Sequence, residues 1–197
     1  MYPRGGLGNQ LFQYGAALEL SINLGCQITV DHSLLNPDIT FSNGNGRRNL
    51  ELDQFESKIP SIKTSYGFGS QLRSKAMTVQ RFVGDKAPNL LVHFGAFANE
   101  RNDQIEVFKS IKRPLVINSY CSSPAYFSAC QDELAQQISR IRNPSEWYLQ
   151  VVKELVEVSP IALHIRLGDY KNFSSVYGRP YPEYYANAVN LITERIG

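Results

Sequence analysis

Apolar residues recur at helical spacing in five stretches of the chain, and several stretches carry a start or stop signal. The first runs from Asn9 to Leu24 and is followed by Gly25, a residue type that often ends helices. Ser123 followed by Pro124 is typical of a helix start. The pattern predicts helices over residues 9–24, 70–82, 124–141, 145–158 and 182–196, with a further segment around 104–110.

Shorter apolar runs between these helices predict strands. They lie at residues 27–30, 90–94 and 115–118, and a longer run follows at 160–167. Between residues 36 and 69 the chain is rich in Asn, Gly, Ser and Pro, which predicts irregular structure over a cleft. Strands that alternate with helices in this way are typical of an α/β fold.

The strand expected at residues 160–167 ends in a cationic side chain. Branched apolar residues alternate there with His164 and Arg166, which predicts a mostly buried strand that Gly168 ends. Ligands of open α/β sheets bind outside the carboxyl ends of the strands, so His164 and Arg166 would face an anion site. The planar guanidinium of Arg166 suits phosphate oxygens. The alternative is an ion pair between Arg166 and Asp169 that only fixes the turn.

A glycine-rich loop precedes the first predicted helix and admits several interpretations. The spacing Gly6-x-Gly8, with Asp31 some twenty residues further on, imitates a dinucleotide-binding fingerprint. Leu11 occupies the third glycine position of that fingerprint, and the stretch before the loop is too short for the usual first strand. No Gly-Lys-Ser or Gly-Lys-Thr follows, which excludes a Walker loop.

Two interpretations of this loop stay open. A tight turn between a strand and a helix would need glycine only for its backbone angles. Glycines also let a sugar phosphate approach the backbone and the start of a helix, where the dipole favours negative charge. In the second case Gly6 and Gly8 bind substrate, and Asn9 and Gln10 lie beside it.

Three motifs together resemble the α1,2-fucosyltransferases. Residues 5–14 read G-G-L-G-N-Q-L-F-Q-Y and residues 164–170 read H-I-R-L-G-D-Y. Residues 118–127 read N-S-Y-C-S-S-P-A-Y-F, similar to a family block in which a strand ends in an aromatic residue and a helix opens toward Tyr-Phe. The resemblance implies an inverting enzyme that transfers fucose from GDP-fucose to the 2-hydroxyl of a galactose-terminated acceptor glycan.

The resemblance also implies a fold. We expect a Rossmann-like parallel sheet with flanking helices, as in the N-terminal lobe of a GT-B-type transferase, over residues 1–158. Residues 159–197 would form the hinge and the start of an incomplete donor-binding lobe, which predicts weak donor binding and little activity for this chain alone. The chain departs from the family at Leu167, where a second Arg is usual. The resemblance is compatible with peripheral association of the full-length enzyme with a membrane.

Glycosyl transfer needs charge neutralisation on the departing diphosphate, a positioned acceptor hydroxyl and a proton acceptor. The sequence contains no Asp-x-Asp, so we expect Arg166 rather than a metal ion to neutralise the diphosphate, with no cofactor. Asn9 and Gln10 are candidates for holding the hydroxyl. His164 is a candidate phosphate contact, and Asp169 is expected to orient Arg166; the general base stays unassigned between His164, Asp169 and another residue.

Composition narrows the classes of function. Of 197 residues, 43% are hydrophobic and 19% are charged, which is typical of a globular protein. The net charge of +2 and the scattered basic residues argue against nucleic-acid binding. Three cysteines without Cys-x-x-Cys spacing argue against a disulfide framework and a zinc site. With no apparent signal peptide, we expect a cytoplasmic protein. A non-catalytic glycan- or nucleotide-binding fragment and an unrelated phosphate-binding α/β enzyme stay as alternatives.

Overall fold

The computed structural model describes residues 1–32, 35, 49–56, 61–62, 68–98, 104–158, 160–165 and 181–196. It divides the chain into two compact units, each described here by itself. The first comprises Met1–Ile39 and Arg47–Asn143, and the second comprises Thr40–Gly46 and Pro144–Gly197. The units are defined by their internal packing and not by function. The expected boundary between an acceptor-side lobe and a donor-binding lobe after residue 158 therefore stays a prediction.

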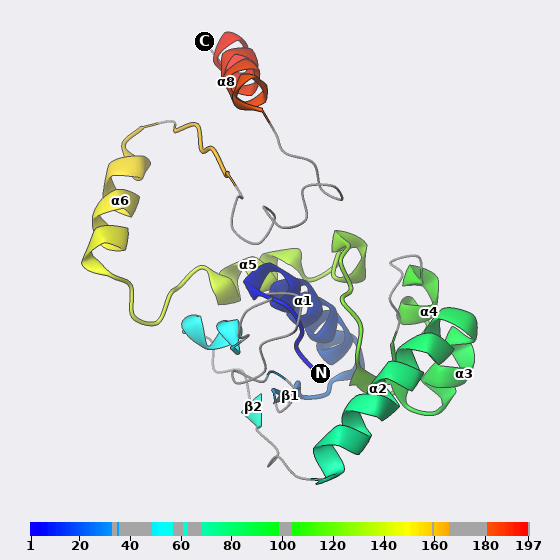
Figure 1. Ribbon diagram of the computed structural model, residues 1–197. Coiled ribbons are helices and arrows are strands. Elements are labelled where there is room, and N and C mark those ends of the chain that lie inside the picture. The colour runs from blue at the N-terminus through cyan, green and yellow to red at the C-terminus, as the bar shows by residue number, and fades with distance from the viewer. Residues whose placement is uncertain are drawn as a thin grey trace. The chain divides into compact units, whose positions relative to one another are not determined.

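The first unit has helices around two short pairs of parallel strands (Figure 1). Strand β1 (Val30–Asp31) pairs with β2 (Ser61–Ile62), and β3 (Ala96–Phe97) pairs with β4 (Val116–Ile117). The remaining elements are α1 (Leu7–Leu24), η1 (Glu51–Gln54), α2 (Phe68–Lys86), α3 (Pro88–His93), α4 (Ile105–Lys109), η2 (Pro124–Tyr126) and α5 (Gln131–Ile138). Helices combined with parallel strands agree with the expected α/β class.

The N-terminal residues lie between the two strand pairs. The backbone N–H of Asp31 donates to the carbonyl of Met1 at 2.9 Å, and the N–H of Tyr2 donates to the carbonyl of Ile117 at 3.0 Å. Backbone hydrogen bonds therefore connect β1 to β4 through this short segment. Although this segment is too short for a usual first strand, it is hydrogen-bonded to both strand pairs and leads directly into the glycine loop.

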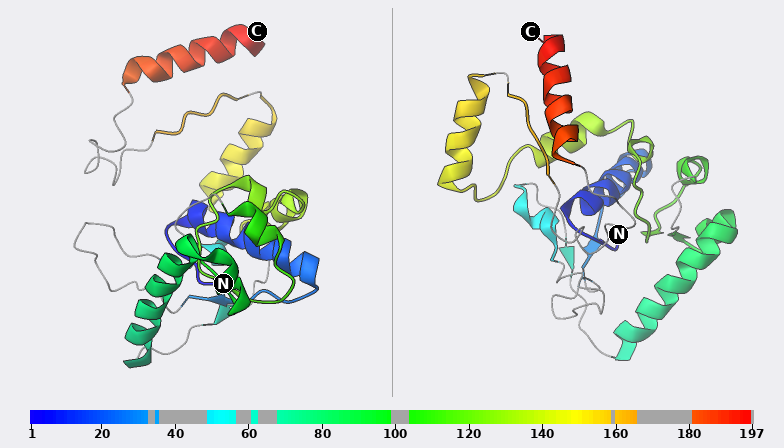
Figure 2. Two further views of the ribbon diagram at one scale, coloured as in Figure 1. Left: turned by 90° about the vertical axis from the view of Figure 1, so that its right-hand side faces the viewer. Right: turned by 45° about the horizontal axis from the view of Figure 1, so that its top comes forward.

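Helix α1 forms where the apolar pattern predicts it. Gly25 ends the helix in the left-handed conformation, with φ at 61°, and its N–H donates to the carbonyl of Ile22 at 3.4 Å. One face of the helix is buried in the main core. A Cβ on Gly15 would lie 2.8 Å from the ring of Phe127 and 3.0 Å from Leu134, so only glycine lets α1 pack so closely on the chain around α5 (Figures 1 and 2).

The strand expected at residues 90–94 is wrong, because this run is helical. Pro88 starts α3, where its missing N–H costs no helical hydrogen bond, and the N–H of Phe94 donates to the carbonyl of Leu90 at 3.2 Å. Only Leu91 is buried in the core there, whereas Leu90 and Phe94 are 52% and 75% exposed. The neighbouring strand is β3, which begins after Gly95. Four apolar residues among the five at 90–94 fit a helix as well as a strand, so the pattern could not decide.

The continuous helix expected over residues 124–141 is interrupted. Ser123 caps a helical turn as expected, because its hydroxyl accepts from the N–H of Ala125 at 3.3 Å. This turn is only the short helix η2. Phe127 then leaves helical geometry and packs edge-on against Phe12, with 5.5 Å between ring centroids. Helix α5 begins only at Gln131. A tertiary contact with α1 therefore accompanies the break.

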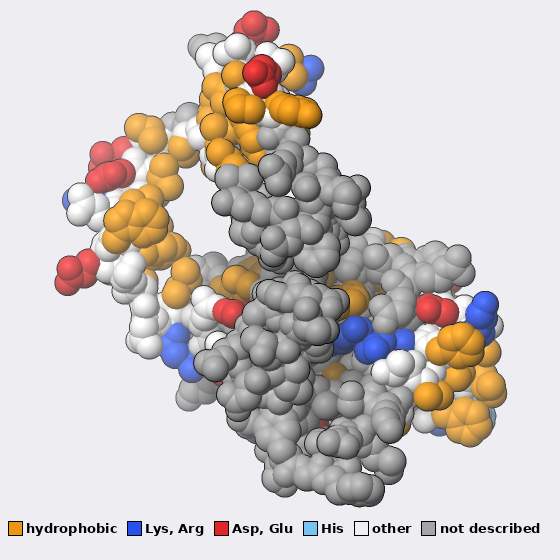
Figure 3. All heavy atoms as spheres, viewed as in Figure 1, with side chains coloured by type: hydrophobic (Ala, Val, Ile, Leu, Met, Phe, Trp, Pro, Cys, Tyr) orange, Lys and Arg blue, Asp and Glu red, His pale blue; other side chains and the backbone are white. Residues whose placement is uncertain are grey.

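The described residues of the second unit form two helices and an extended segment. Helix α6 (Glu146–Val156) starts as predicted, with the hydroxyl of Ser145 accepting from the N–H of Tyr148 at 3.1 Å. Helix α8 covers Pro182–Ile196, the predicted range. Apolar side chains of both helices are exposed, and Figure 3 shows them along α6 and α8 and also over α3 of the first unit.

The expected buried strand at 160–167 is not found in its described part. Residues 160–165 have no regular secondary structure, and Ile161, Leu163 and Ile165 are 36%, 51% and 53% exposed. A strand buries its alternating side chains only when neighbouring strands pair with it, and these residues pair with no described strand. Separately, no helix among the described residues is long and apolar enough to cross a lipid bilayer.

Candidate functional site

The glycine loop joins the N-terminal segment to α1 and needs glycine at its first position. Gly5 has φ at +72°, a region that glycine adopts without strain. A Cβ on Gly5 would also lie 2.3 Å from the side-chain nitrogen of Asn9. Gly6 is the N-cap of α1 and offers no capping side chain. The loop therefore passes close over the first turn of the helix.

The buried Gln10 side chain holds this loop in place through hydrogen bonds. It is fully buried, and its amide nitrogen donates to the carbonyls of Gly5 at 3.0 Å and Asn49 at 2.9 Å. Its amide oxygen accepts from the N–H of Glu51 at 2.9 Å. One side chain thus ties the glycine loop to η1. This placement makes Gln10 a positioning residue, and the direct contact with substrate that the sequence suggested stays a prediction.

Gln13, one turn further along α1, holds the residue before the glycines. Its amide oxygen accepts from the N–H of Arg4 at 2.9 Å, and its amide nitrogen donates to the carbonyl of Arg4 at 3.1 Å. This pair of bonds satisfies the Arg4 backbone as a neighbouring strand would. Sequence reasoning missed Gln13, although a second glutamine three residues after Gln10, on a helix that packs into a core, was the available signal.

Arg4 is a further cation at the loop that sequence reasoning missed. Its guanidinium carbon lies 4.4 Å from the centroid of the Tyr120 ring, within the range of a cation–π contact. Tyr120 follows β4, so the contact joins the N-terminal segment to the adjacent strand end. With its backbone held by Gln13 and its head group stacked on Tyr120, Arg4 is oriented from both ends.

The outer side of the loop is open. Gly8 and Asn9 are exposed in the first turn of α1, and nothing lies within 4 Å of the position that a Cβ on Gly8 would occupy. The first turn contains no acidic residue. The first backbone N–H groups of any α-helix lack partners within the helix and carry partial positive charge. These N–H groups and the exposed Asn9 amide offer donors to an anion with hydroxyl groups, while the Arg4 guanidinium lies against Tyr120 with one nitrogen buried.

Buried polar residues follow β4 beside this loop. The N–H of Asn118 donates to the carbonyl of Phe97 at 2.8 Å, and its side-chain nitrogen reaches the amide oxygen of Gln80 at 3.5 Å. Cys121 adopts φ at 49° and is fully buried, and burial raises the pKa of its thiol to about 12. A thiol with this pKa stays protonated at neutral pH. Cys121 is therefore a packing residue rather than a nucleophile.

Three predicted site residues belong to the second unit. His164 lies exposed in the extended segment of the second unit. Arg166 and Asp169 lie outside the described residues. Within the described ranges, no three His, Cys, Asp or Glu side chains are grouped so that they could hold a metal ion.

Comparison with family models, with curated proteins and with solved structures gave no match to this chain. The likeness to the α1,2-fucosyltransferases therefore rests on the three motifs alone. The structure adds a physical account of one motif, since Gly5, Gln10 and Gln13 are each required by the contacts described above.

Proposed function

We propose that this chain carries the acceptor-side, Rossmann-like lobe of a GT-B-type glycosyltransferase that moves fucose from GDP-fucose to the 2-hydroxyl of a galactose-terminated glycan, with inversion. The observation that carries the proposal is the hydrogen-bonded glycine loop, with Arg4 stacked on Tyr120, before an exposed helix start. Two buried glutamines are used to shape a loop whose outer surface is exposed. Such an arrangement fits a sugar phosphate better than a simple turn.

The chemistry assigned to these residues is direct displacement. The acceptor oxygen forms a bond to the anomeric carbon while the bond from that carbon to the diphosphate breaks. The acceptor proton passes to a general base, which stays unassigned, and negative charge collects on GDP. Arg166, with help from backbone N–H groups, would stabilise that charge without a metal ion. Asn9 would hold the acceptor hydroxyl in line.

A transfer assay tests this proposal. The full-length protein, in which the donor-binding lobe is expected to be complete, is incubated with radiolabelled GDP-fucose and a galactose-terminated disaccharide in EDTA, and the linkage of the product is determined by NMR. We expect an α1,2 linkage and no requirement for divalent metal. Arg166→Ala should lower the rate at least a hundredfold, because loss of a charge-assisted phosphate contact costs about 3 to 5 kcal/mol in a dry site. A requirement for manganese or magnesium would show that a metal does the neutralising.

Arg4→Ala tests the loop itself. We expect weaker binding of GDP-fucose by about tenfold, because one charge-assisted contact is lost. Arg142→Ala is the matched control, since Arg142 is exposed on the same unit and lies away from the glycine loop in sequence. Equal binding by the Arg4 variant and the parent would refute the role of the loop. Binding of GDP-fucose without transfer to any galactoside would favour a nucleotide-binding module over an enzyme.

A further inference from the structure

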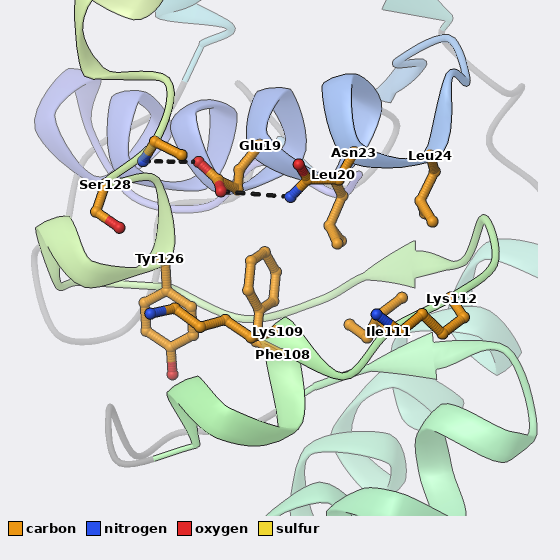
Figure 4. Close-up of a pocket in the computed structure, with 11 residues that line it drawn as sticks. Glu19, Leu20, Asn23, Leu24, Phe108, Lys109, Ile111, Lys112, Tyr126 and Ser128 are labelled. Carbon is orange, nitrogen blue, oxygen red and sulfur yellow. Dashed lines mark hydrogen bonds between the residues drawn. The ribbon is translucent and has the colours of Figure 1, made fainter.

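A second candidate site lies on the first unit at the other end of α1. A groove of about 490 Å³ runs between the C-terminal half of this helix, the end of α4 with the residues after it, and the chain from Tyr126 to Ala129 (Figure 4). Glu19, on its rim, follows Leu7 by twelve residues, which is about 18 Å along a helix. The groove is therefore distinct from the glycine loop, and its volume falls in the range of small-ligand sites.

The surface that a ligand would meet in this groove is part polar and part apolar. Its floor is made by Leu20, Phe108, Ile111 and Tyr126, and each of these side chains is at most 7% exposed. The more accessible rim combines polar and charged side chains with two apolar ones: Glu19, Asn23, Leu24, Lys109, Lys112, Ser128 and Ala129. The floor residues are nearly closed to a ligand, so polar contacts with it would come from the rim.

The two sides of the groove differ in charge. On the α1 side, the Glu19 carboxylate accepts from the N–H of Ala129 at 3.2 Å and from the amide nitrogen of Asn23 at 3.3 Å. Its oxygens are already used to hold the rim together. On the opposite side, Lys109 and Lys112 are exposed, and they bring two ammonium groups to one wall (Figure 4). The groove therefore offers more positive than negative charge to a ligand.

We propose that this groove binds an acidic oligosaccharide, with its carboxylates on Lys109 and Lys112 and its hydroxyls on Asn23 and Ser128. Sugar hydroxyls both donate and accept, and the Asn23 amide and the Ser128 hydroxyl supply partners for both. Lys109 and Lys112 can each bind one carboxylate of an oligosaccharide that carries a carboxylate on successive sugar units. Two lysines are too few for nucleic acid, whose binding depends on many phosphate contacts. The proposal stands independently of fucosyl transfer.

The test is NMR titration of the whole protein with a trisaccharide of galacturonate, in 50 mM salt. We expect the largest shifts at the backbone amides of Asn23, Lys109, Lys112 and Ser128. Lys109→Gln and Lys112→Gln should each weaken binding about fivefold, the value for one exposed charge pair. Asn23→Ala should also weaken it, without a change of charge. Both lysines are exposed, so circular dichroism should show an unchanged fold.

Three comparisons decide whether the groove is specific. Lys86→Gln, an exposed lysine on α2 of the same unit, should bind as tightly as the parent. A neutral glucose trisaccharide and a peptide of six glutamates should bind at least fivefold more weakly. Shifts elsewhere, equal binding by the Lys109 and Lys112 double variant, equal loss in the Lys86 variant or equal binding of the glutamate peptide would each overturn the proposal.

Discussion

Replacement of Gln10 by Met isolates the contribution of its buried amide. The two side chains have similar length and volume, so the packing inside the first unit is kept. The variant loses the bonds to the carbonyls of Gly5 and Asn49 and the bond from the N–H of Glu51. These three backbone groups are then left without their partner in a partly buried region.

The expected cost follows from those three bonds. Each buried hydrogen bond contributes about 1 kcal/mol, and a group that loses its partner without reaching water costs somewhat more. Asn49 is exposed, so water can replace the lost bond at its carbonyl. We therefore expect Gln10→Met to lower the free energy of unfolding by about 2 to 3 kcal/mol, a large part of the stability of a small domain.

Urea unfolding followed by circular dichroism measures this difference, with Gln136→Met as the control. Gln136 is exposed on α5, so the same substitution there should change the free energy of unfolding by less than about 0.5 kcal/mol. Hydrogen exchange adds a local measurement, because the Glu51 amide should exchange faster in the Gln10 variant. A loss below about 0.5 kcal/mol, with unchanged exchange at Glu51, would refute the assigned role of Gln10.

Three further predictions concern close packing and buried thiols. Gly84→Ala should lower the free energy of unfolding in urea by about 2 to 3 kcal/mol or more, because the new Cβ would lie 1.4 Å from the carbonyl oxygen of Ala98; no loss would show that the two backbones can separate freely. A thiol reagent should modify Cys26 first, while Cys121 and Cys130 should react only on unfolding, because burial raises the pKa of each of these two thiols to about 12. Mass spectrometry identifies the labelled residues, and early labelling of Cys121 or Cys130 would contradict their burial. Because the folded Cys121 thiol keeps its proton at a pH where the unfolded thiol has lost it, the free energy of unfolding should fall as pH rises from about 9 to 12, and a Cys121→Ala variant should show a smaller fall.

Local signals in the sequence predicted several elements well. Gly25 ends α1, Ser145 caps α6, and Pro182 to Ile196 form α8, as the apolar spacing and the capping residues indicated. These signals work because a cap or a terminating glycine acts on backbone groups within a few residues of itself. The pattern also predicted a strand near β4 and a mixed α/β class.

Tertiary contacts decided the rest. The run at residues 90–94 could become a helix or a strand, and the packing of Leu91 on the core beside β3 accompanies the helix. The break before α5 coincides with the contact of Phe127 with Phe12, more than a hundred residues earlier. At the glycine loop, the sequence by itself determined that glycines and amides stand before a helix.

Only the folded chain decided which of those residues face inward. Gln10 and Gln13 turn toward the backbone of the loop, while Asn9 stays exposed and Arg4 stacks on Tyr120. The spacing of residues along a helix determines which of them share a face. Contacts with other segments determine which face is buried. Those contacts come from distant segments, such as η1 and the end of β4, and no local pattern of residues specifies them.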